Sequence, residues 1–252
     1  MESPSVSRRS IVLLPGLGAN ERLFAPQLAA FADRGAFVPA YPTPVEPRRG
    51  VEGVAEDLHD ALHADGCLHR DAALVGFSFG GQVALSLARR MLRHGGPPAR
   101  SIVLVSGLRR TSQLTRRFRL QVAASALLPD AAIAWAATEI VARPFARACG
   151  LDHDQTLELA RMAAELDVPR LRRLAQAACR WRFEDADEAS LRAAGTRILH
   201  LHSDRDPVIP PPPPSIVGVE RLATPGHLLT WTHARRVNAL IEDAIGRHGD
   251  RS

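Results

Sequence analysis

Residues 76–80 read Gly-Phe-Ser-Phe-Gly and match the pattern Gly-x-Ser-x-Gly, with Ser78 at the centre. An apolar stretch, residues 72–75, precedes them, and a helix-forming stretch, residues 81–90, follows. A serine in a sharp turn from strand to helix has a strained backbone and presents its hydroxyl above the sheet, while flanking glycines allow close packing. The helix N-terminus directs free N–H groups at negative charge forming beside the serine. The pattern predicts a serine nucleophile; the alternative is a serine that only caps the helix.

A serine hydroxyl becomes a good nucleophile when a neighbouring base takes its proton and a carboxylate orients that base. The candidate acid is Asp206, in a segment that ends a predicted strand and so emerges at the carboxyl edge of a parallel sheet. Asp204 is the alternative acid. The candidate base is His227, in the turn before the last predicted helix, and its alternative is a buried structural histidine. The order Ser, Asp, His is one of the known chain orders of such triads.

Three motifs give the chain a resemblance to α/β-hydrolases of the small, capped serine esterase type. They are Leu-Pro-Gly-Leu-Gly at residues 14–18, Gly-Phe-Ser-Phe-Gly-Gly at residues 76–81, and Asp-Pro-Val-Ile-Pro at residues 206–210 followed by Pro-Gly-His at 225–227. The resemblance spans nearly the whole chain. It implies a cofactor-free ester hydrolase with an oxyanion hole made by the backbone N–H groups of Leu17 and Phe79. Pro15 stands where the family usually has a histidine, which often braces this loop.

The predicted elements alternate between strand and helix, which favours an α/β fold with a mostly parallel central sheet and helices on both faces. We expect helices at residues 49–66 and 232–248. We expect strands at residues 10–14, 35–41, 72–75, 101–106, 196–202 and 217–222. The five prolines at 210–214 indicate a stiff connector, although a ligand for a proline-binding module is an alternative.

Between residues 107 and 191 this alternation stops, and the segment indicates four or five helices with breaks at Pro129, Pro144, Gly150 and Pro169. A single crossover needs only a dozen or more residues. We therefore predict an α/β-hydrolase core, residues 1–106 and 192–252, with an all-helical cap inserted at residues 107–191. Ordinary crossover helices are the alternative. The cap is expected to line the pocket with side chains that include Leu120, Leu127, Trp135 and Phe145.

Composition bounds the class of protein. The chain has 252 residues, 46% hydrophobic and 23% charged, as in ordinary globular proteins, and no apolar run long enough for a membrane helix. Three scattered cysteines, Cys67, Cys149 and Cys179, do not make a disulfide framework. We see no separate apolar leader and expect a cytoplasmic protein. We expect a monomer or small homo-oligomer that acts on a small-molecule ester.

All basic residues are arginine, and the formal net charge is +5. Recognition of phosphate or nucleic acid is one reading, but the arginines are interleaved with acids along the chain, which favours an ordinary surface. We therefore expect no nucleic-acid or membrane partner. One stretch without acids carries Arg109, Arg110, Arg116, Arg117 and Arg119. If it borders the entrance, it favours a substrate that is neutral or has an anionic leaving group.

Two histidine pairs have the spacing of metal ligands. His59 and His63 lie four apart on a predicted helix, and His200 and His202 lie two apart on a strand. His200 and His202 have no acidic or cysteine partner at ligand spacing. His59 and His63 lack the His-Glu-x-x-His pattern and indicate a solvated helix face, so we expect no metal and no cofactor. Fold and triad alone leave open a non-catalytic ligand receptor, a carbon–carbon bond hydrolase, an acyltransferase, or a hydrolase of thioesters or lactones.

Overall fold

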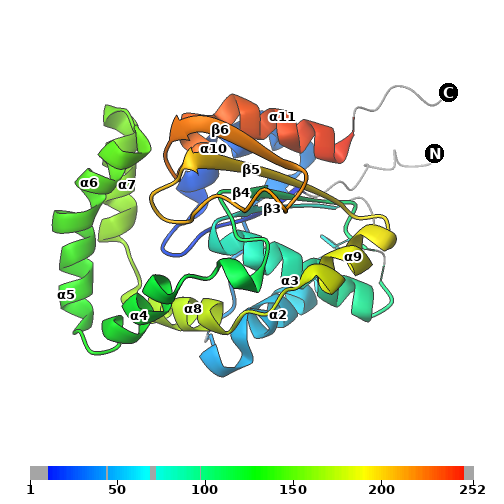
Figure 1. The fold of residues 1–252 in the computed structure, drawn as a ribbon, viewed down its shortest axis with the longest axis horizontal. Coiled ribbons are helices and arrows are strands. Elements are labelled where there is room, and N and C mark those ends of the chain that lie inside the picture. Colours follow the sequence, from blue (N-terminus) through cyan, green and yellow to red (C-terminus); the bar gives the residue numbers. More distant parts are fainter. Residues whose placement is uncertain (1–10, 44, 69–71, 97, 247–252) are drawn as a thin grey trace, which may run out of the picture.

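A six-stranded sheet forms the centre of the computed structural model, which describes residues 11–43, 45–68, 72–96 and 98–246 (Figure 1). The strands lie in the order β2-β1-β3-β4-β5-β6, and every neighbouring pair is parallel. The predicted α/β fold is therefore confirmed. The strands are β1 (Ile11–Leu14), β2 (Ala36–Phe37), β3 (Ala73–Phe77), β4 (Ser101–Val105), β5 (Arg197–Arg205) and β6 (Val219–Pro225).

Helices cover both faces of this sheet, and the alternation of side chains along each strand explains why. On β1, Val12 and Leu14 pack into a cluster with α2 (Gly50–Ala64) and α3 (Phe79–Arg93). Ile11 and Leu13 point to the other face, toward α11 (Ala234–Ile245), and α1 (Ala25–Ala30) contacts that helix. Strands buried on both faces read as continuous apolar runs, which is the pattern seen in the sequence.

Most predicted elements differ by a few residues at their ends, and three of these differences have a clear physical or structural origin. The strand predicted at residues 35–41 shrinks to β2, because Pro39 has no N–H for the ladder. The strand predicted from residue 217 begins at Val219, after Gly218, whose φ of 72° is incompatible with an extended strand. The last predicted helix, from residue 232, begins at Ala234 as α11, and a separate short helix, α10 (Leu229–Thr232), precedes it. Residues 10, 247 and 248 of the predicted elements lie outside the described residues.

Residues 107–191 contain no strand, and six α-helices lie between β4 and β5. They are α4 (Arg116–Ser125), α5 (Asp130–Trp135), α6 (Ala142–Cys149), α7 (His153–Ala164), α8 (Val168–Arg180) and α9 (Asp185–Ala193). The predicted break at Pro144 is absent, since this proline lies in the first turn of α6, where no intrahelical donor is needed. A π-helical turn, Ala136–Val141, joins α5 to α6. No helix among the described residues is long and apolar enough to cross a membrane.

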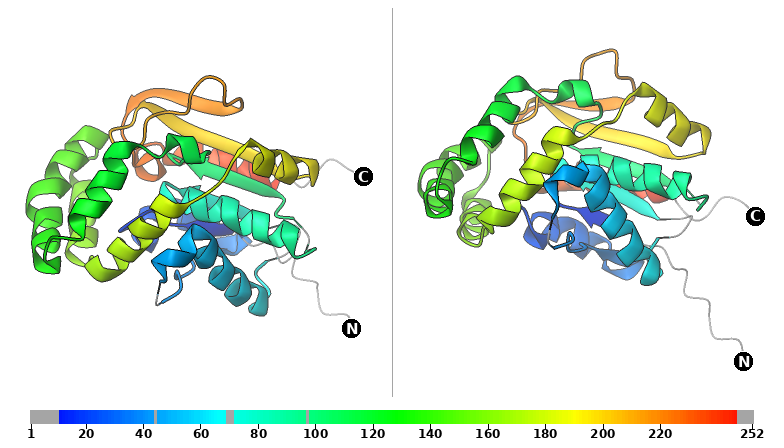
Figure 2. Two further views of the ribbon diagram at one scale, coloured as in Figure 1. Left: turned by 60° about the horizontal axis from the view of Figure 1, so that its bottom comes forward. Right: turned by 90° about the horizontal axis from the view of Figure 1, so that it is seen from below.

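This segment has two parts that lie differently. The helices α5, α6 and α7 stand together at one end of the molecule, beyond the sheet (Figures 1 and 2). In contrast, α8 packs on α2, and α9 packs on α3. Trp181, Phe183 and Leu191 belong to the same apolar cluster as α2 and α3, and Trp181 Nε1 donates to Ser86 Oγ at 3.2 Å. The end of the segment thus covers the core, and the domain boundary at residue 191 stays a prediction.

Candidate active site

Ser78 lies in a tight turn between β3 and α3, with φ 52° and ψ −118°. A side chain is strained in that region, and such strain is typical of functional positions. The turn is compact because the glycines beside it have no Cβ. A Cβ on Gly76 would lie 2.4 Å from the Gly80 carbonyl oxygen, and one on Gly80 would lie 1.9 Å from the Leu14 carbonyl oxygen. Both glycines are therefore needed to bring β1, β3 and α3 together around Ser78.

The predicted acid and base are in contact. Asp206 Oδ2 lies 2.7 Å from His227 Nδ1, and both side chains are buried. The other oxygen, Asp206 Oδ1, accepts the backbone N–H groups of Val208 at 2.8 Å and Ile209 at 2.9 Å. Since a carboxylate only accepts, His227 Nδ1 carries the proton and Nε2 is left free to accept one. Asp204, the alternative acid, instead pairs with Arg221 at 2.5 Å on the surface.

The loop that carries His227 is held by the end of α6. The His227 N–H donates to Cys149 Sγ at 3.4 Å, and the Phe77 ring lies 4.9 Å from the imidazole. Gly226 has φ 120°, and a Cβ there would lie 2.7 Å from the Cys149 carbonyl oxygen. Sequence reasoning missed Cys149, because the contact joins residues 78 apart and no local pattern marks it.

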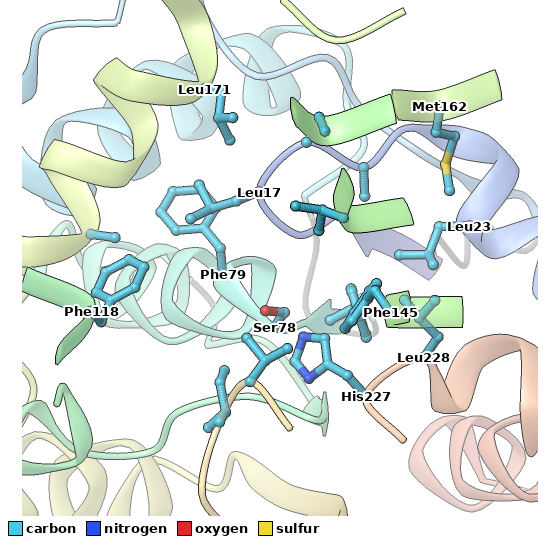
Figure 3. Close-up of a pocket in the computed structure, with 18 of the residues that line it drawn as sticks. Leu17, Leu23, Ser78, Phe79, Phe118, Phe145, Met162, Leu171, His227 and Leu228 are labelled. Atoms are coloured by element: carbon cyan, nitrogen blue, oxygen red, sulfur yellow. The ribbon is translucent and has the colours of Figure 1, made fainter. Parts of the chain in front are cut away.

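Ser78 and His227 line one cavity of about 320 Å³, and Figure 3 shows them near each other among the residues that line it. The walls come from the loop after β1, the start of α3, the helices α4, α6, α7 and α8, the π-helical turn and the loop after β5. Nearly all the lining side chains are apolar, among them Leu17, Leu23, Phe79, Phe118, Phe145, Met162, Leu171 and Leu228. The cavity thus suits an apolar group beside the serine.

Of the four lining side chains predicted from residues 107–191, only Phe145 lines this cavity. Leu120, Leu127 and Trp135 are exposed to solvent, so their prediction was wrong. On α4 the lining side chain is Phe118, and a residue two positions further along points about 200° away around the helix. The large apolar residues of α4, Phe118, Leu120 and Val122, are spaced by two and point in different directions, so its sequence does not reveal which side faces the cavity.

The two predicted oxyanion donors come from two segments that meet at Ser78, the loop after β1 and the start of α3. Phe79 is the first residue of α3, so its N–H has no partner within the helix. Leu17 follows Gly16, where a Cβ would lie 3.0 Å from the Phe77 ring and 3.2 Å from Ser78 Cβ. The loop after β1 therefore packs tightly against the turn that holds Ser78. The role of these two N–H groups stays a prediction.

Tyr41 braces this loop, although no local sequence pattern marks it for that role. Its hydroxyl donates to the Pro15 carbonyl oxygen at 2.7 Å, and its ring meets Phe79 edge to face at 5.8 Å between centroids. Burial raises the pKa of Tyr41 well above its usual value, so the hydroxyl stays protonated and donates. Arg170 of α8 donates to the Tyr41 carbonyl oxygen at 2.6 Å. Tyr41 thus takes the place of the bracing side chain that Pro15 lacks.

Three of the five arginines between residues 109 and 119 make structural contacts. Arg109 is buried, pairs with Glu188, and donates to the Val217 carbonyl oxygen at 2.8 Å. Arg110 also pairs with Glu188, and Arg119 donates to the Cys179 carbonyl oxygen at 3.1 Å. Burial alone would raise the pKa of Glu188, but the hydrogen bonds from arginines outweigh it and lower the pKa to about 2. Only the exposed Arg116 and Arg117 are left for a cationic entrance.

Neither histidine pair belongs to a metal cluster. Within residues 11–43, 45–68, 72–96 and 98–246, no three His, Cys, Asp or Glu side chains gather closely enough to hold an ion. The rings of His59 and His63 stack at 5.7 Å on α2 near the surface. His200 and His202 are buried behind Asp206, where His202 Nε2 lies 3.6 Å from Asp206 Oδ2.

The model of the alpha/beta hydrolase family matches residues 11–240, so the chain belongs to that family. Solved structures share the fold. A thermophilic esterase from Thermogutta terrifontis has 18% identity and a TM-score of 0.69, covering 93% of this chain and 88% of that one. The RedJ thioesterase of prodiginine biosynthesis in Streptomyces coelicolor has 20% identity and a TM-score of 0.63, covering 96% and 87%. The enol-lactonase from Burkholderia xenovorans has 14% identity and a TM-score of 0.68, covering 96% and 93%.

Proposed function

We propose that the protein is a cofactor-free serine hydrolase that cleaves carboxylic esters of small or medium apolar acyl groups. The observation that carries this proposal is the placement of Ser78 and His227 in one cavity, with Asp206 2.7 Å from the far ring nitrogen of His227. A strained serine, an imidazole and a buried carboxylate form the set of groups that acyl transfer uses. Membership of the alpha/beta hydrolase family supports it.

In the proposed reaction the Ser78 oxygen bonds to the substrate carbonyl carbon while His227 Nε2 takes the hydroxyl proton. Asp206 holds His227 in the tautomer with the proton on Nδ1 and supports the positive charge that the ring acquires. The N–H groups of Leu17 and Phe79 stabilise the oxyanion. His227 then gives its proton to the leaving alcohol. Water repeats these steps on the acyl-enzyme, which releases the carboxylic acid and restores Ser78.

We further propose that α4 to α7 act as the cap of this site. Phe118 of α4, Phe145 of α6 and Met162 of α7 line the cavity above the serine, so they would exclude water and receive the acyl group. The cavity of about 320 Å³ is near the lower limit for small-molecule sites, which favours small or medium substrates. Its apolar lining favours a neutral acyl group over a charged one.

The nature of the leaving group is a separate part of the proposal. The neighbours named above as an esterase, a thioesterase and an enol-lactonase share this fold. An oxygen ester and a thioester with the same acyl group distinguish the first two activities. We expect the higher kcat/KM on the oxygen ester, and a clear preference for the thioester would make the protein a thioesterase on the same residues.

The experiment that tests the proposal is turnover of p-nitrophenyl esters by purified wild type and Ser78→Ala. We expect turnover by wild type to peak at short or medium acyl chains, and Ser78→Ala to lose several orders of magnitude in kcat with an unchanged fold. Equal activity in both proteins would refute the role of Ser78. Saturable ester binding without turnover in wild type would instead favour the ligand-receptor alternative.

A further inference from the structure

A chain of hydrogen-bonded side chains continues behind the proposed triad. His202 Nε2 lies 3.0 Å from the Ile209 carbonyl oxygen, and His202 Nδ1 lies 3.2 Å from His200 Nε2. Both rings are buried, and His202 Nε2 is also 3.6 Å from Asp206 Oδ2, the oxygen that faces His227. Asp206 Oδ2 therefore lies near two imidazole rings, and only that of His227 takes part in the proposed reaction.

The hydrogen bonds determine where the protons lie on this pair. The Ile209 carbonyl oxygen only accepts, so His202 Nε2 must carry a proton. In a neutral ring His202 Nδ1 is then bare and accepts from His200 Nε2–H. His200 Nδ1 is bare in turn, and this buried atom has no hydrogen-bond partner within the described residues. The pair thus fixes one tautomer of His202, with its N–H directed at the turn that carries the acid.

Burial keeps both rings neutral near pH 7. It lowers the pKa of His202, although the hydrogen bond to Ile209 and the charge of Asp206 act in the opposite direction. Burial, helped by His202 and Arg109, holds the pKa of His200 well below its usual value. The other charged or titratable groups that face the pair are Asp206, His227, Arg221 and Glu188. A proton on His202 would compete with His227 for the charge of Asp206, and burial prevents this.

The turn that holds Asp206 depends on this anchor. Asp206 Oδ1 accepts from the N–H groups of Val208 and Ile209, so the carboxylate is oriented by the backbone that follows it. Pro207 and Val208 are exposed, and of these turn residues only the half-buried Ile209 packs against the core. The His202 bond to the Ile209 carbonyl ties the end of the turn to β5. Loss of this bond would free the turn and move the carboxylate relative to His227.

We propose that His202, held in one neutral tautomer by His200, is the positioning residue of the triad acid. It acts through the Ile209 carbonyl, which fixes the turn and thereby the direction of Asp206. The inference rests on the proposed function, but the tautomer of His202 can be measured without assuming that Ser78 is the nucleophile. An error of about 1 Å in the position of a catalytic group can cost about 100-fold in rate. We therefore expect a loss in kcat of about 10- to 100-fold without the His202 N–H.

The test compares three variants in ester turnover over a range of pH. His202→Leu removes the N–H donor, whereas His202→Gln keeps an amide N–H that reaches toward the Ile209 carbonyl. The control is Thr196→Val, which removes a buried hydrogen bond to the Ala99 carbonyl next to the start of β5, the end away from Asp206. We expect His202→Leu to lower kcat with little change in KM and to move the acid limb of the kcat/KM profile to lower pH, because the imidazolium of His227 is less well supported. His202→Gln should recover most of the rate, and Thr196→Val should move neither the limb nor kcat.

Three results would overturn the proposal. One is a folded His202→Leu variant with wild-type kcat and pH profile, and another is a His202→Gln variant as impaired as His202→Leu. The third comes from ¹⁵N NMR of histidine-labelled wild type, which needs no variant to fold. The proposal requires a neutral His202 with Nε2 protonated and Nδ1 bare between pH 7 and 8. Any other state refutes it, even if Ser78→Ala has already established the proposed function.

Discussion

The clearest prediction that the structure allows for a residue outside the proposed triad concerns Tyr41. Tyr41→Phe removes one oxygen atom and leaves the Pro15 carbonyl without its 2.7 Å donor in a buried place. An unsatisfied buried carbonyl costs about 1–3 kcal/mol, so we expect a loss of unfolding free energy in that range. Pro15 lies two residues before the proposed oxyanion donor Leu17, so part of this disturbance reaches the site.

The effect on rate has an upper bound. Complete loss of one oxyanion donor costs about 2.7–4 kcal/mol, or about 100- to 1,000-fold in kcat. Tyr41→Phe loosens the loop without removing the N–H of Leu17, so we expect a smaller loss in kcat, about 10-fold, with KM changed less than about twofold. The oxyanion forms only during the reaction, which is why the change should appear in kcat and not in substrate binding.

The assay is steady-state turnover of one p-nitrophenyl ester together with thermal unfolding. The matched control is Ser86→Ala, which removes a buried hydroxyl that accepts from Trp181 Nε1 at 3.2 Å. Ser86 lies about two turns along α3 from Phe79, away from the loop after β1. It should lose similar stability and keep its kcat. Equal kcat for Tyr41→Phe and wild type, or an equal kcat loss in both variants, would refute the bracing role of Tyr41.

Three further predictions follow from the site and its surroundings. Asp206→Asn should lower kcat by about 10³- to 10⁴-fold, because the amide favours the wrong tautomer of His227. Asp204→Asn changes only the surface pair with Arg221 and should keep a kcat near that of wild type. Similar losses in both variants would contradict the assignment of Asp206 as the acid. Ala163→Phe adds a ring to the cavity wall and should reduce kcat/KM for longer acyl chains far more than for acetate, and an unchanged chain-length profile would mean that the acyl group lies elsewhere. Glu188, whose pKa falls from 4.5 to about 2 on folding, should contribute stability that is complete above pH 4.5 and is lost as the pH falls toward 2. Glu188→Gln should flatten that part of the curve of unfolding free energy against pH, and an unchanged acid slope would contradict this origin.

Much of the fold and of the site could be predicted because the signals are local. Ser78 lies in a motif whose glycines are required by contacts within a few residues, as the Gly76 and Gly80 distances demonstrate. The strands beside it are buried on both faces and therefore appear as apolar runs. The choice of Asp206 over Asp204 rested on the residues that follow it, whose backbone N–H groups bind its carboxylate.

The features that sequence reasoning missed depend on contacts between distant parts of the chain. Tyr41 follows the edge strand β2 and donates to the loop after β1, and Cys149 at the end of α6 accepts from the backbone of His227. From the sequence, His202 is recognisable only as half of a candidate metal pair, because its contact depends on where the Ile209 carbonyl lies. In the segment between β4 and β5, the choice between Phe118 and Leu120 depends on how α4 is rotated, which periodicity alone does not determine.

The most direct test of the central claim is to locate the adduct of a fluorophosphonate probe by peptide mass spectrometry. The account predicts that wild type acquires one phosphonyl group, on Ser78, and loses ester turnover in proportion to labelling. Ser78→Ala should take up no label under the same conditions while its unfolding curve stays close to that of wild type. Labelling on another residue, or an unlabelled wild type that still turns over esters, would contradict the claim that Ser78 is the nucleophile.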